Sequence, residues 1–183
     1  MDRPVAEVLS IRQVYQGRVF RVSADRVRLP GDHEVTFDVV RHNGSVVLLP
    51  MKDDGRLILV KQYRYVIDRW VWELPAGTLK PGEDPAAAAA RECEEEIALV
   101  PHRVERLVSA FPTPGYCDEE MNFFLVSDLR EPAPDSTVKP DEDEMLLPQA
   151  FTLDELGQMI RDGEIVDLKT FAGVALLEWA NRR

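Results

Sequence analysis

Apolar residues alternate with polar ones over much of the first 50 residues, which is the period of a half-buried β-strand. The alternation covers 17–28 and 34–41, and a short apolar run follows at 45–50. Pro30-Gly31-Asp32 separates the first two segments. Asn43-Gly44 stands before the third segment and is typical of a two-residue hairpin turn. The first 50 residues are therefore predicted to form strands, with a hairpin at Asn43-Gly44.

Strands and helices are mixed along the rest of the chain. Strands are predicted at 56–65, 103–112 and 121–127, and helices at 85–99, 152–162 and 168–181. The first helix has Asp84 as its expected N-cap and Pro85 at its first position. Thr152 and Glu155 fit a capping box at the second helix. This order predicts a mixed α/β (α+β) fold rather than a regular βαβ alternation.

Composition sets the size of the fold and limits its partners. The chain has 183 residues, which predicts one domain or one domain with a small appendage. Acidic residues (33) exceed basic residues (22), and the formal net charge is −11. Nucleic acids and anionic membranes both require a basic surface. We therefore expect neither as a partner.

Targeting signals and disulfides are not apparent in the sequence. No uncharged apolar stretch approaches the roughly 20 residues that a membrane span needs. The N-terminal segment MDRPVAEVLS contains an early acid and no apolar run typical of a signal peptide. The two cysteines, Cys93 and Cys117, do not make a disulfide framework. We expect a cytoplasmic protein.

Three carboxylates share one face of the first predicted helix. Glu92, Glu95 and Glu96 have the spacing i, i+3 and i+4, at which like charges repel by a few tenths of a kcal/mol per pair. One interpretation is an acidic face in solvent. The other is a site for a divalent cation, since Mg²⁺ binds carboxylate oxygens together with substrate phosphates. The spacing of these three residues alone leaves both interpretations open.

The segment around these carboxylates resembles the Nudix box, G-x5-E-x7-R-E-U-x-E-E-x-G-U. Its fixed positions are occupied by Gly77, Glu83, Arg91, Glu92, Glu95 and Glu96. Cys93 replaces a bulky aliphatic residue, a mild change because a buried cysteine behaves as a small hydrophobe. Ala98 replaces the second glycine, so the end of this helix is expected to differ from the usual left-handed turn.

The resemblance implies a fold and a metal site. The Nudix fold is a mixed sheet sandwiched between helices, and in this case an N-terminal antiparallel sheet would precede it. Glu92 and Glu96 would be the main ligands of Mg²⁺, with Mn²⁺ as the other candidate, and Glu95 would complete the site. The backbone carbonyl of Ala76 is a further implied ligand. Arg91 would be structural and pair with a neighbouring glutamate.

Segments outside the box resemble the ADP-ribose pyrophosphatase branch of the Nudix family. They are Lys61-Gln62-Tyr63-Arg64, Trp72-Glu73-Leu74-Pro75-Ala76-Gly77, Pro114-Gly115-Tyr116-Cys117-Asp118-Glu119 and Asp167-Leu168-Lys169-Thr170. The resemblance implies metal-dependent hydrolysis of ADP-ribose to AMP and ribose 5-phosphate. It also implies that Arg64, Glu73 and Gly115 bind the substrate, with Arg64 on a phosphate. The candidates to stack on the nucleobase are aromatic residues that are more often part of a core or an interface: Phe20, Tyr15, Tyr65, Trp70 and Trp72.

An acidic run at 140–144 follows a proline-rich segment at 131–140. On composition alone, a solvated loop is one interpretation of this run. By resemblance to the acidic loop of ADP-ribose pyrophosphatases, Glu142 becomes the first candidate for the general base or a mobile metal ligand. Glu144 is the second candidate, and Glu95 belongs to the same catalytic set.

Assembly and substrate are the remaining expectations. In this branch the N-terminal sheet is commonly exchanged between protomers, so we expect residues 1–45 to form a dimerisation segment and 46–183 the Nudix hydrolase domain. The expected assembly is a homodimer with composite sites. Lys61 replaces an arginine of the branch motif, which leaves another nucleoside-diphosphate sugar, such as GDP-mannose, as an alternative substrate. A non-catalytic ADP-ribose sensor is a second alternative, although it would require the loss of the glutamates or an added DNA-binding domain.

Overall fold

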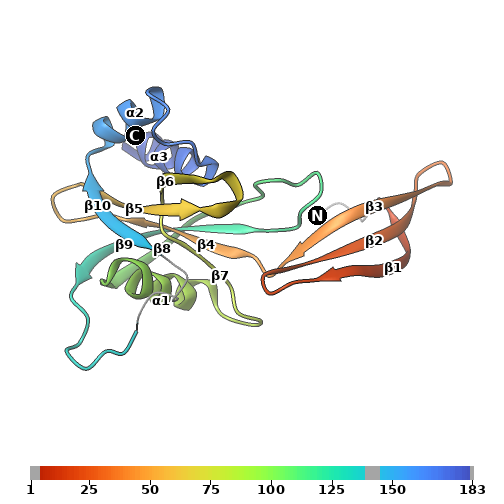
Figure 1. Ribbon diagram of the computed structural model, residues 1–183, viewed down its shortest axis with the longest axis horizontal. Coiled ribbons are helices and arrows are strands. Elements are labelled where there is room, and N and C mark those ends of the chain that lie inside the picture. The colour runs from red at the N-terminus through yellow and green to blue at the C-terminus, as the bar shows by residue number, and fades with distance from the viewer. Residues whose placement is uncertain (1–4, 139–144, 182–183) are drawn as a thin grey trace. The chain divides into compact units, whose positions relative to one another are not determined.

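The computed structural model describes residues 5–138 and 145–181 (Figure 1). The chain divides into two compact units. The first unit comprises Met1–Gly44 and Ala110–Glu120, and the second comprises Ser45–Ser109 and Met121–Arg183. Within the described part of the chain, no helix is both long and apolar enough to cross a membrane.

The first unit is built on a three-stranded antiparallel sheet. Its strands are β1 (Glu7–Gln16), β2 (Phe20–Leu29) and β3 (His33–His42), in the order β1-β2-β3. The segment 110–120 lies beside β3, where the amide of Val40 donates to the carbonyl of Tyr116 at 2.7 Å. This sheet confirms that the N-terminal region consists of strands. Its assignment to a dimer interface stays a prediction.

The hairpin predicted at Asn43-Gly44 is wrong. β3 ends at His42 and belongs to the first sheet, whereas the next strand, β4 (Ser45–Pro50), pairs with two strands of the second unit. Gly44 has φ of 86° and allows the chain to turn from one sheet to the other. The physical reason is burial: all six residues of β4 are buried, so this strand needs neighbours on both edges and cover on both faces.

The second unit contains two sheets. One has the order β7-β4-β9-β8, with β7 (Ala76–Thr78), β9 (Met121–Arg130) and β8 (Val100–Ala110), and β4 and β9 are parallel. The other has the order β10-β5-β6, with β10 (Leu146–Phe151), β5 (Leu57–Arg64) and β6 (Arg69–Glu73). A short 3₁₀ helix, η1 (Tyr65–Ile67), connects β5 to β6. β6, β7 and β10 were not predicted, because they are short and show no clear alternation.

Three helices lie close to their predicted positions: α1 (Pro85–Ile97), α2 (Leu153–Arg161) and α3 (Leu168–Asn181). The carboxylate of Asp84 accepts from the amide of Ala87 at 3.0 Å, and Thr152 with Glu155 forms the predicted capping box. The expectation for the end of α1 is wrong. Ala98 adopts the left-handed conformation, with φ 55° and ψ 38°, although it carries a Cβ.

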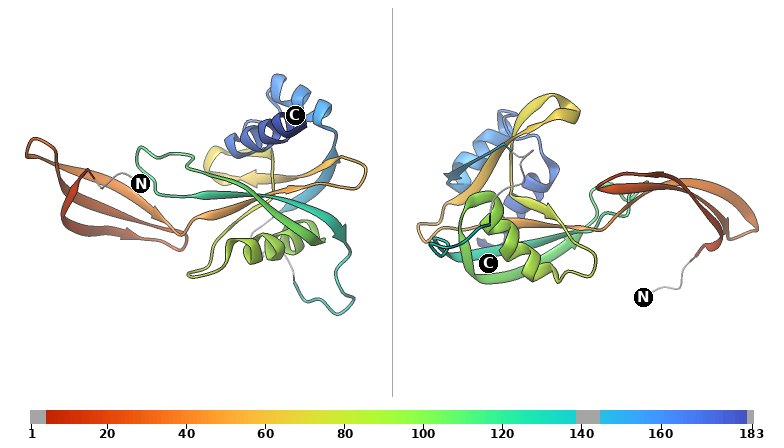
Figure 2. Two further views of the ribbon diagram at one scale, coloured as in Figure 1. Left: turned by 180° about the vertical axis from the view of Figure 1, so that it is seen from behind. Right: turned by 60° about the horizontal axis from the view of Figure 1, so that its bottom comes forward.

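The strands of the second unit lie between α1 on one side and α2 with α3 on the other (Figures 1 and 2). Alternate residues of β4 therefore face two cores. Val46 and Leu48 pack in the core that contains Ala88, Ala89 and Cys93 of α1. Val47 and Leu49 pack in the core that contains Leu156 of α2 with Val174 and Leu177 of α3. This arrangement confirms the predicted sandwich of a mixed sheet between helices.

Cys93 takes the core position expected of it. Its side chain is fully buried on the inner side of α1, and burial raises the pKa of its thiol to about 12. The thiol therefore stays protonated and serves as an apolar core residue.

Candidate active site

Arg91 of α1 connects three carboxylates. Its Nε and Nη2 donate to the two oxygens of Glu83 at 2.9 and 3.0 Å. Its Nη1 donates to Glu92 at 2.7 Å and to Glu95 at 2.6 Å. The guanidinium holds the pKa of Glu83 below its ordinary value, and the amide of Lys80 adds a further hydrogen bond to that carboxylate. The cluster formed by these charged side chains is consistent with the structural role expected of Arg91.

Glu92 is 8% exposed and lies against Gly77. A Cβ placed on Gly77 would lie 1.9 Å from both Cδ and Oε1 of Glu92. Gly77 has no positive φ, so its backbone conformation is open to other residues. The glycine is therefore required here for space, because the carboxylate occupies the position that a side chain would take.

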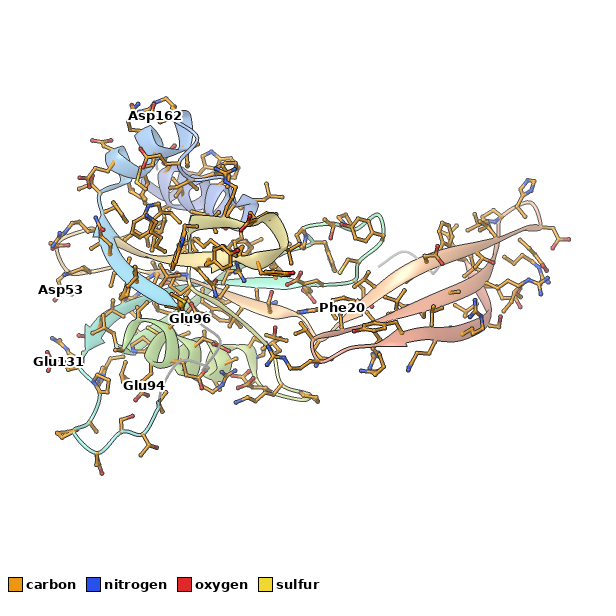
Figure 3. All side chains as sticks on the ribbon, in the orientation of Figure 1. Phe20, Asp53, Glu94, Glu96, Glu131 and Asp162 are labelled. Carbon is orange, nitrogen blue, oxygen red and sulfur yellow. The ribbon has the colours of Figure 1, made fainter. Side chains whose placement is uncertain are left out.

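Glu96 is the most buried of the predicted ligands, at 7% exposure. Its Oε2 accepts from the amide of Ala76 at 3.2 Å, which joins α1 to the start of β7. In Figure 3, Glu96 lies on the side of α1 that faces the strands, whereas Glu94 lies on the opposite side of the helix. The structure therefore brings Ala76, Glu92 and Glu96 to the inner face of α1.

This donor set suits a hard divalent cation. In the described residues, no cluster of three or more His, Cys, Asp or Glu side chains already surrounds a cation position. Glu92 and Glu95 both contact the guanidinium of Arg91. The donors on offer are carboxylate and carbonyl oxygens, which Mg²⁺ and Mn²⁺ prefer. Arg91 also contacts more negative charges than it can neutralise, and a bound cation would offset the excess.

A second group of charged residues lies at the ends of β5 and β6. Arg64 donates from Nε and Nη2 to the two oxygens of Glu73 at 2.7 and 2.6 Å, and Lys169 of α3 also contacts Glu73. Burial raises the pKa of Glu73, but Arg64 and Lys169 outweigh it and hold that pKa below its ordinary value. This fixed guanidinium can present its remaining nitrogen, Nη1, to an anion.

These side chains lie beside a pocket of about 340 Å³. Its lining comprises Arg64, Val66, Ile67, Val71, Glu73, Val166, Asp167, Leu168 and Lys169. The volume falls at the lower end of the range for small-molecule sites, and a few polar groups among apolar walls are typical of them. Lys169 was not predicted as a site residue. Its motif, Asp167-Leu168-Lys169-Thr170, was the available signal.

Phe20 and Gly115 belong to the first unit. Phe20 is partly exposed, and its ring centroid lies 6.0 Å from that of Tyr15. Gly115 lines a pocket of about 290 Å³ beside β3, together with Phe37 and Tyr116. Their roles in substrate binding stay predictions. Glu142 and Glu144, the candidates for the general base, lie outside the described residues.

Comparison with known proteins identifies the family. The NUDIX domain model matches residues 41–172, which is most of the chain. The chain therefore belongs to the Nudix family, as its resemblance to the Nudix box predicted.

Two relatives cover almost the whole chain. A methanol dehydrogenase activator from Bacillus methanolicus is 33% identical over 94% of this chain and 92% of its own length. An ADP-ribose pyrophosphatase from Mycobacterium tuberculosis is 36% identical over 92% of this chain and 81% of its own length. Other relatives carry the name GDP-mannose pyrophosphatase.

The fold matches a crystal structure of an ADP compounds hydrolase with a TM-score of 0.84. The two chains are 22% identical, and the match covers 99% of this chain and 97% of the other. At this identity the likeness shows the fold alone.

Proposed function

We propose that the protein hydrolyses the pyrophosphate bond of ADP-ribose and releases AMP and ribose 5-phosphate. The observation that carries the proposal is the inner face of α1, where Glu92 and Glu96 are buried and Glu92 also belongs to the cluster around Arg91. A relative at 36% identity that is named ADP-ribose pyrophosphatase supports the choice of substrate.

The cofactor in this proposal is Mg²⁺, with Mn²⁺ as the other candidate. Glu92, Glu96 and Glu95 hold it, together with the backbone carbonyl of Ala76. When bound, the cation supplies neutralisation of charge on the phosphate oxygens. The oxygen-only donor set and the excess negative charge around Arg91 support this assignment.

The remaining chemistry is assigned to residues of the chain. Arg64 binds a phosphate through its guanidinium, which Glu73 holds by two hydrogen bonds. Glu142 removes the proton from the attacking water, with Glu144 as the second candidate, by resemblance to the acidic loop of the branch. By the same resemblance, Phe20 and Gly115 are the remaining residues assigned to substrate binding.

The proposed assembly is a homodimer that exchanges its N-terminal strands. Apolar side chains on the three strands of the first unit support it, because Val8, Ile11, Val14, Phe20 and Phe37 are each at least 42% exposed. Val8, Ile11 and Phe37 share one face of this sheet, whereas Phe20 lies on the other. Exposed apolar side chains that gather on one face are typical of an interface. A monomeric mass at micromolar concentration would contradict the dimer. The cytoplasmic location stays a prediction.

The test is phosphate release from a panel of nucleoside diphosphate compounds with Mg²⁺, after coupling to a phosphatase. Wild-type protein is compared with Glu96→Gln and with Glu94→Gln, a matched control whose carboxylate contacts Ser136 rather than the inner face of α1. We expect ADP-ribose to lead the panel, Glu96→Gln to lose activity and Glu94→Gln to keep it.

The same panel decides between the alternatives. A profile led by GDP-mannose would keep the chemistry and change the substrate, and the relatives named GDP-mannose pyrophosphatase favour this alternative over others. Binding of ADP-ribose without turnover of any compound would indicate a sensor and contradict the proposal.

A further inference from the structure

Two cations share one buried carboxylate at the end of β6. Glu73 is 3% exposed and Lys169 is 8% exposed, so both charges are largely removed from water. Lys169 Nζ contacts Oε2 of Glu73, the same oxygen that accepts from Nη2 of Arg64 at 2.6 Å. The side chain of Arg64 is 44% exposed, so its guanidinium is the part of this network that a ligand can reach.

The second cation changes the charge that Arg64 presents. In an isolated pair, Glu73 would neutralise Arg64, and the guanidinium would attract an anion only weakly. Lys169 supplies a further positive charge to the same carboxylate, so the three groups together keep a positive charge. Because the site is partly buried, this charge acts through a lower dielectric than bulk water.

Asp167 brings a second negative charge to this group, and that charge acts on Arg64 as well as on Lys169. It lies 3.1 Å from Lys169, but its Oδ2 also accepts from the amide and the hydroxyl of Thr170, at 2.9 and 2.6 Å. These bonds place the carboxylate of Asp167 at the N-terminus of α3, where the helix dipole stabilises negative charge.

The start of α3 also holds the backbone that carries Glu73. The hydroxyl of Thr170, which is fully buried, accepts from the amide of Leu74 at 2.9 Å. A Cβ on Gly173 would lie 2.3 Å from Cδ1 of Leu74. The close approach of α3 to Leu74 therefore requires glycine at position 173. Lys169 therefore lies on a helix that is held against the backbone next to Glu73.

We propose that Lys169 is a positioning residue for phosphate binding: it holds Glu73 from α3, fixes the plane of the Arg64 guanidinium and offsets the carboxylates beside Arg64, so that the guanidinium can attract the diphosphate. The proposal rests on the proposed function, because it takes Arg64 as a phosphate ligand. It assigns a role to a buried lysine 96 residues away along the chain from the carboxylate that it contacts.

The test compares steady-state kinetics of Lys169→Met, Lys169→Arg and wild type with ADP-ribose and Mg²⁺. Arg64 binds phosphate in the ground state and the transition state alike, so Lys169→Met should raise KM roughly tenfold and change kcat by less than about threefold. Lys169→Arg restores the cation and should return KM to within about threefold of wild type. Lys52→Met, in the turn before β5, is the matched control and should leave both constants unchanged.

A merely structural role gives a different pattern. In that case kcat would fall with the folded fraction while KM stayed constant, and this outcome would overturn the proposal. Lys169→Met also leaves Glu73 with less positive charge, and such a change can unfold a protein. The second measurement therefore compares the Glu73→Gln variant with the double variant Glu73→Gln/Lys169→Met. Neither of them has a carboxylate at position 73. If Lys169 acts through Glu73, KM should differ by less than about twofold between these two variants. A tenfold difference would refute the proposal that Lys169 acts through Glu73.

Failure of the proposed function is distinguishable from failure of this inference. Wild-type protein that turns over no nucleoside diphosphate compound would refute the function itself. Calorimetric binding of ADP then tests Lys169 directly: roughly tenfold weaker binding by Lys169→Met supports the inference, and equal binding overturns it.

Discussion

The contact between Gly77 and Glu92 makes Gly77→Ala a sensitive probe of the candidate active site. The new Cβ would lie 1.9 Å from Cδ and Oε1 of Glu92 and 2.4 Å from Oε2. Carbon atoms in van der Waals contact are about 3.5 Å apart, so the carboxylate must move by roughly 1.6 Å. Gly77 has no positive φ, so the backbone accepts alanine without strain. The protein should therefore fold, with the carboxylate of Glu92 displaced.

A displacement of this size should remove most of the activity. Misplacement of a catalytic group by about 1 Å can cost about 100-fold in rate, so we expect kcat on ADP-ribose to fall at least about 100-fold. The assay is phosphatase-coupled turnover with Mg²⁺, run beside far-UV circular dichroism and thermal unfolding to show that the variant is folded.

Gly157→Ala is the matched control. Its Cβ would lie 3.5 Å from Nη1 of Arg161, an ordinary contact, within helix α2. Alanine in a helix interior is about 0.5–1 kcal/mol better than glycine, so this variant should be slightly more stable and fully active. Turnover of Gly77→Ala near the wild-type rate would refute the reasoning, because it would mean that the position of Glu92 has no bearing on catalysis.

Three further predictions concern stability and the base. Arg91→Met should lower the free energy of unfolding by about 2 kcal/mol at pH 7, because Glu83 loses two charge-assisted hydrogen bonds. The same guanidinium holds the pKa of Glu83 below its ordinary value. A carboxyl group whose pKa is lowered on folding stabilises the fold at pH values above its unfolded pKa of about 4.3, and this stabilisation is lost as the pH falls. In urea unfolding, the difference in stability between wild type and Arg91→Met should therefore shrink below about pH 4. A difference that stays constant with pH would contradict the role given to Glu83. Ala98→Gly should raise the free energy of unfolding by about 1 kcal/mol, because alanine is strained at φ 55°, and no gain in thermal unfolding would contradict this. Glu142→Gln should lower kcat at least about 100-fold with KM within about threefold, and near wild-type kcat would move the role of base to Glu144.

Local signals explain which elements of the fold were predictable. The caps Asp84 and Thr152 mark the starts of α1 and α2, because an N-cap side chain bonds an amide within the next three residues. The Asn43-Gly44 dipeptide is also a local signal, and the hairpin predicted from it was wrong. Such a dipeptide indicates a tight turn but does not show which strands pair. The pairing of β4 with β9 depends on burial at both faces, which is a property of the whole sheet.

In the candidate site, too, local features were predictable from the sequence, whereas contacts between distant segments were not. The carboxylates of α1 were predictable because a helix places residues three and four apart on one face. The neighbours that set their environment were not. The space that Gly77 leaves for Glu92 and the contact between Lys169 and Glu73 both depend on packing between distant segments. The acidic loop with Glu142 rests on resemblance, and its residues lie outside the described part of the chain.

The most direct test of the central claim is chromatographic identification of the products from ADP-ribose incubated with the wild-type protein and Mg²⁺. The account predicts AMP and ribose 5-phosphate in equal amounts, and no products when EDTA removes the cation. ADP-ribose that stays intact in the presence of folded protein and Mg²⁺, or products that form equally with EDTA, would contradict it.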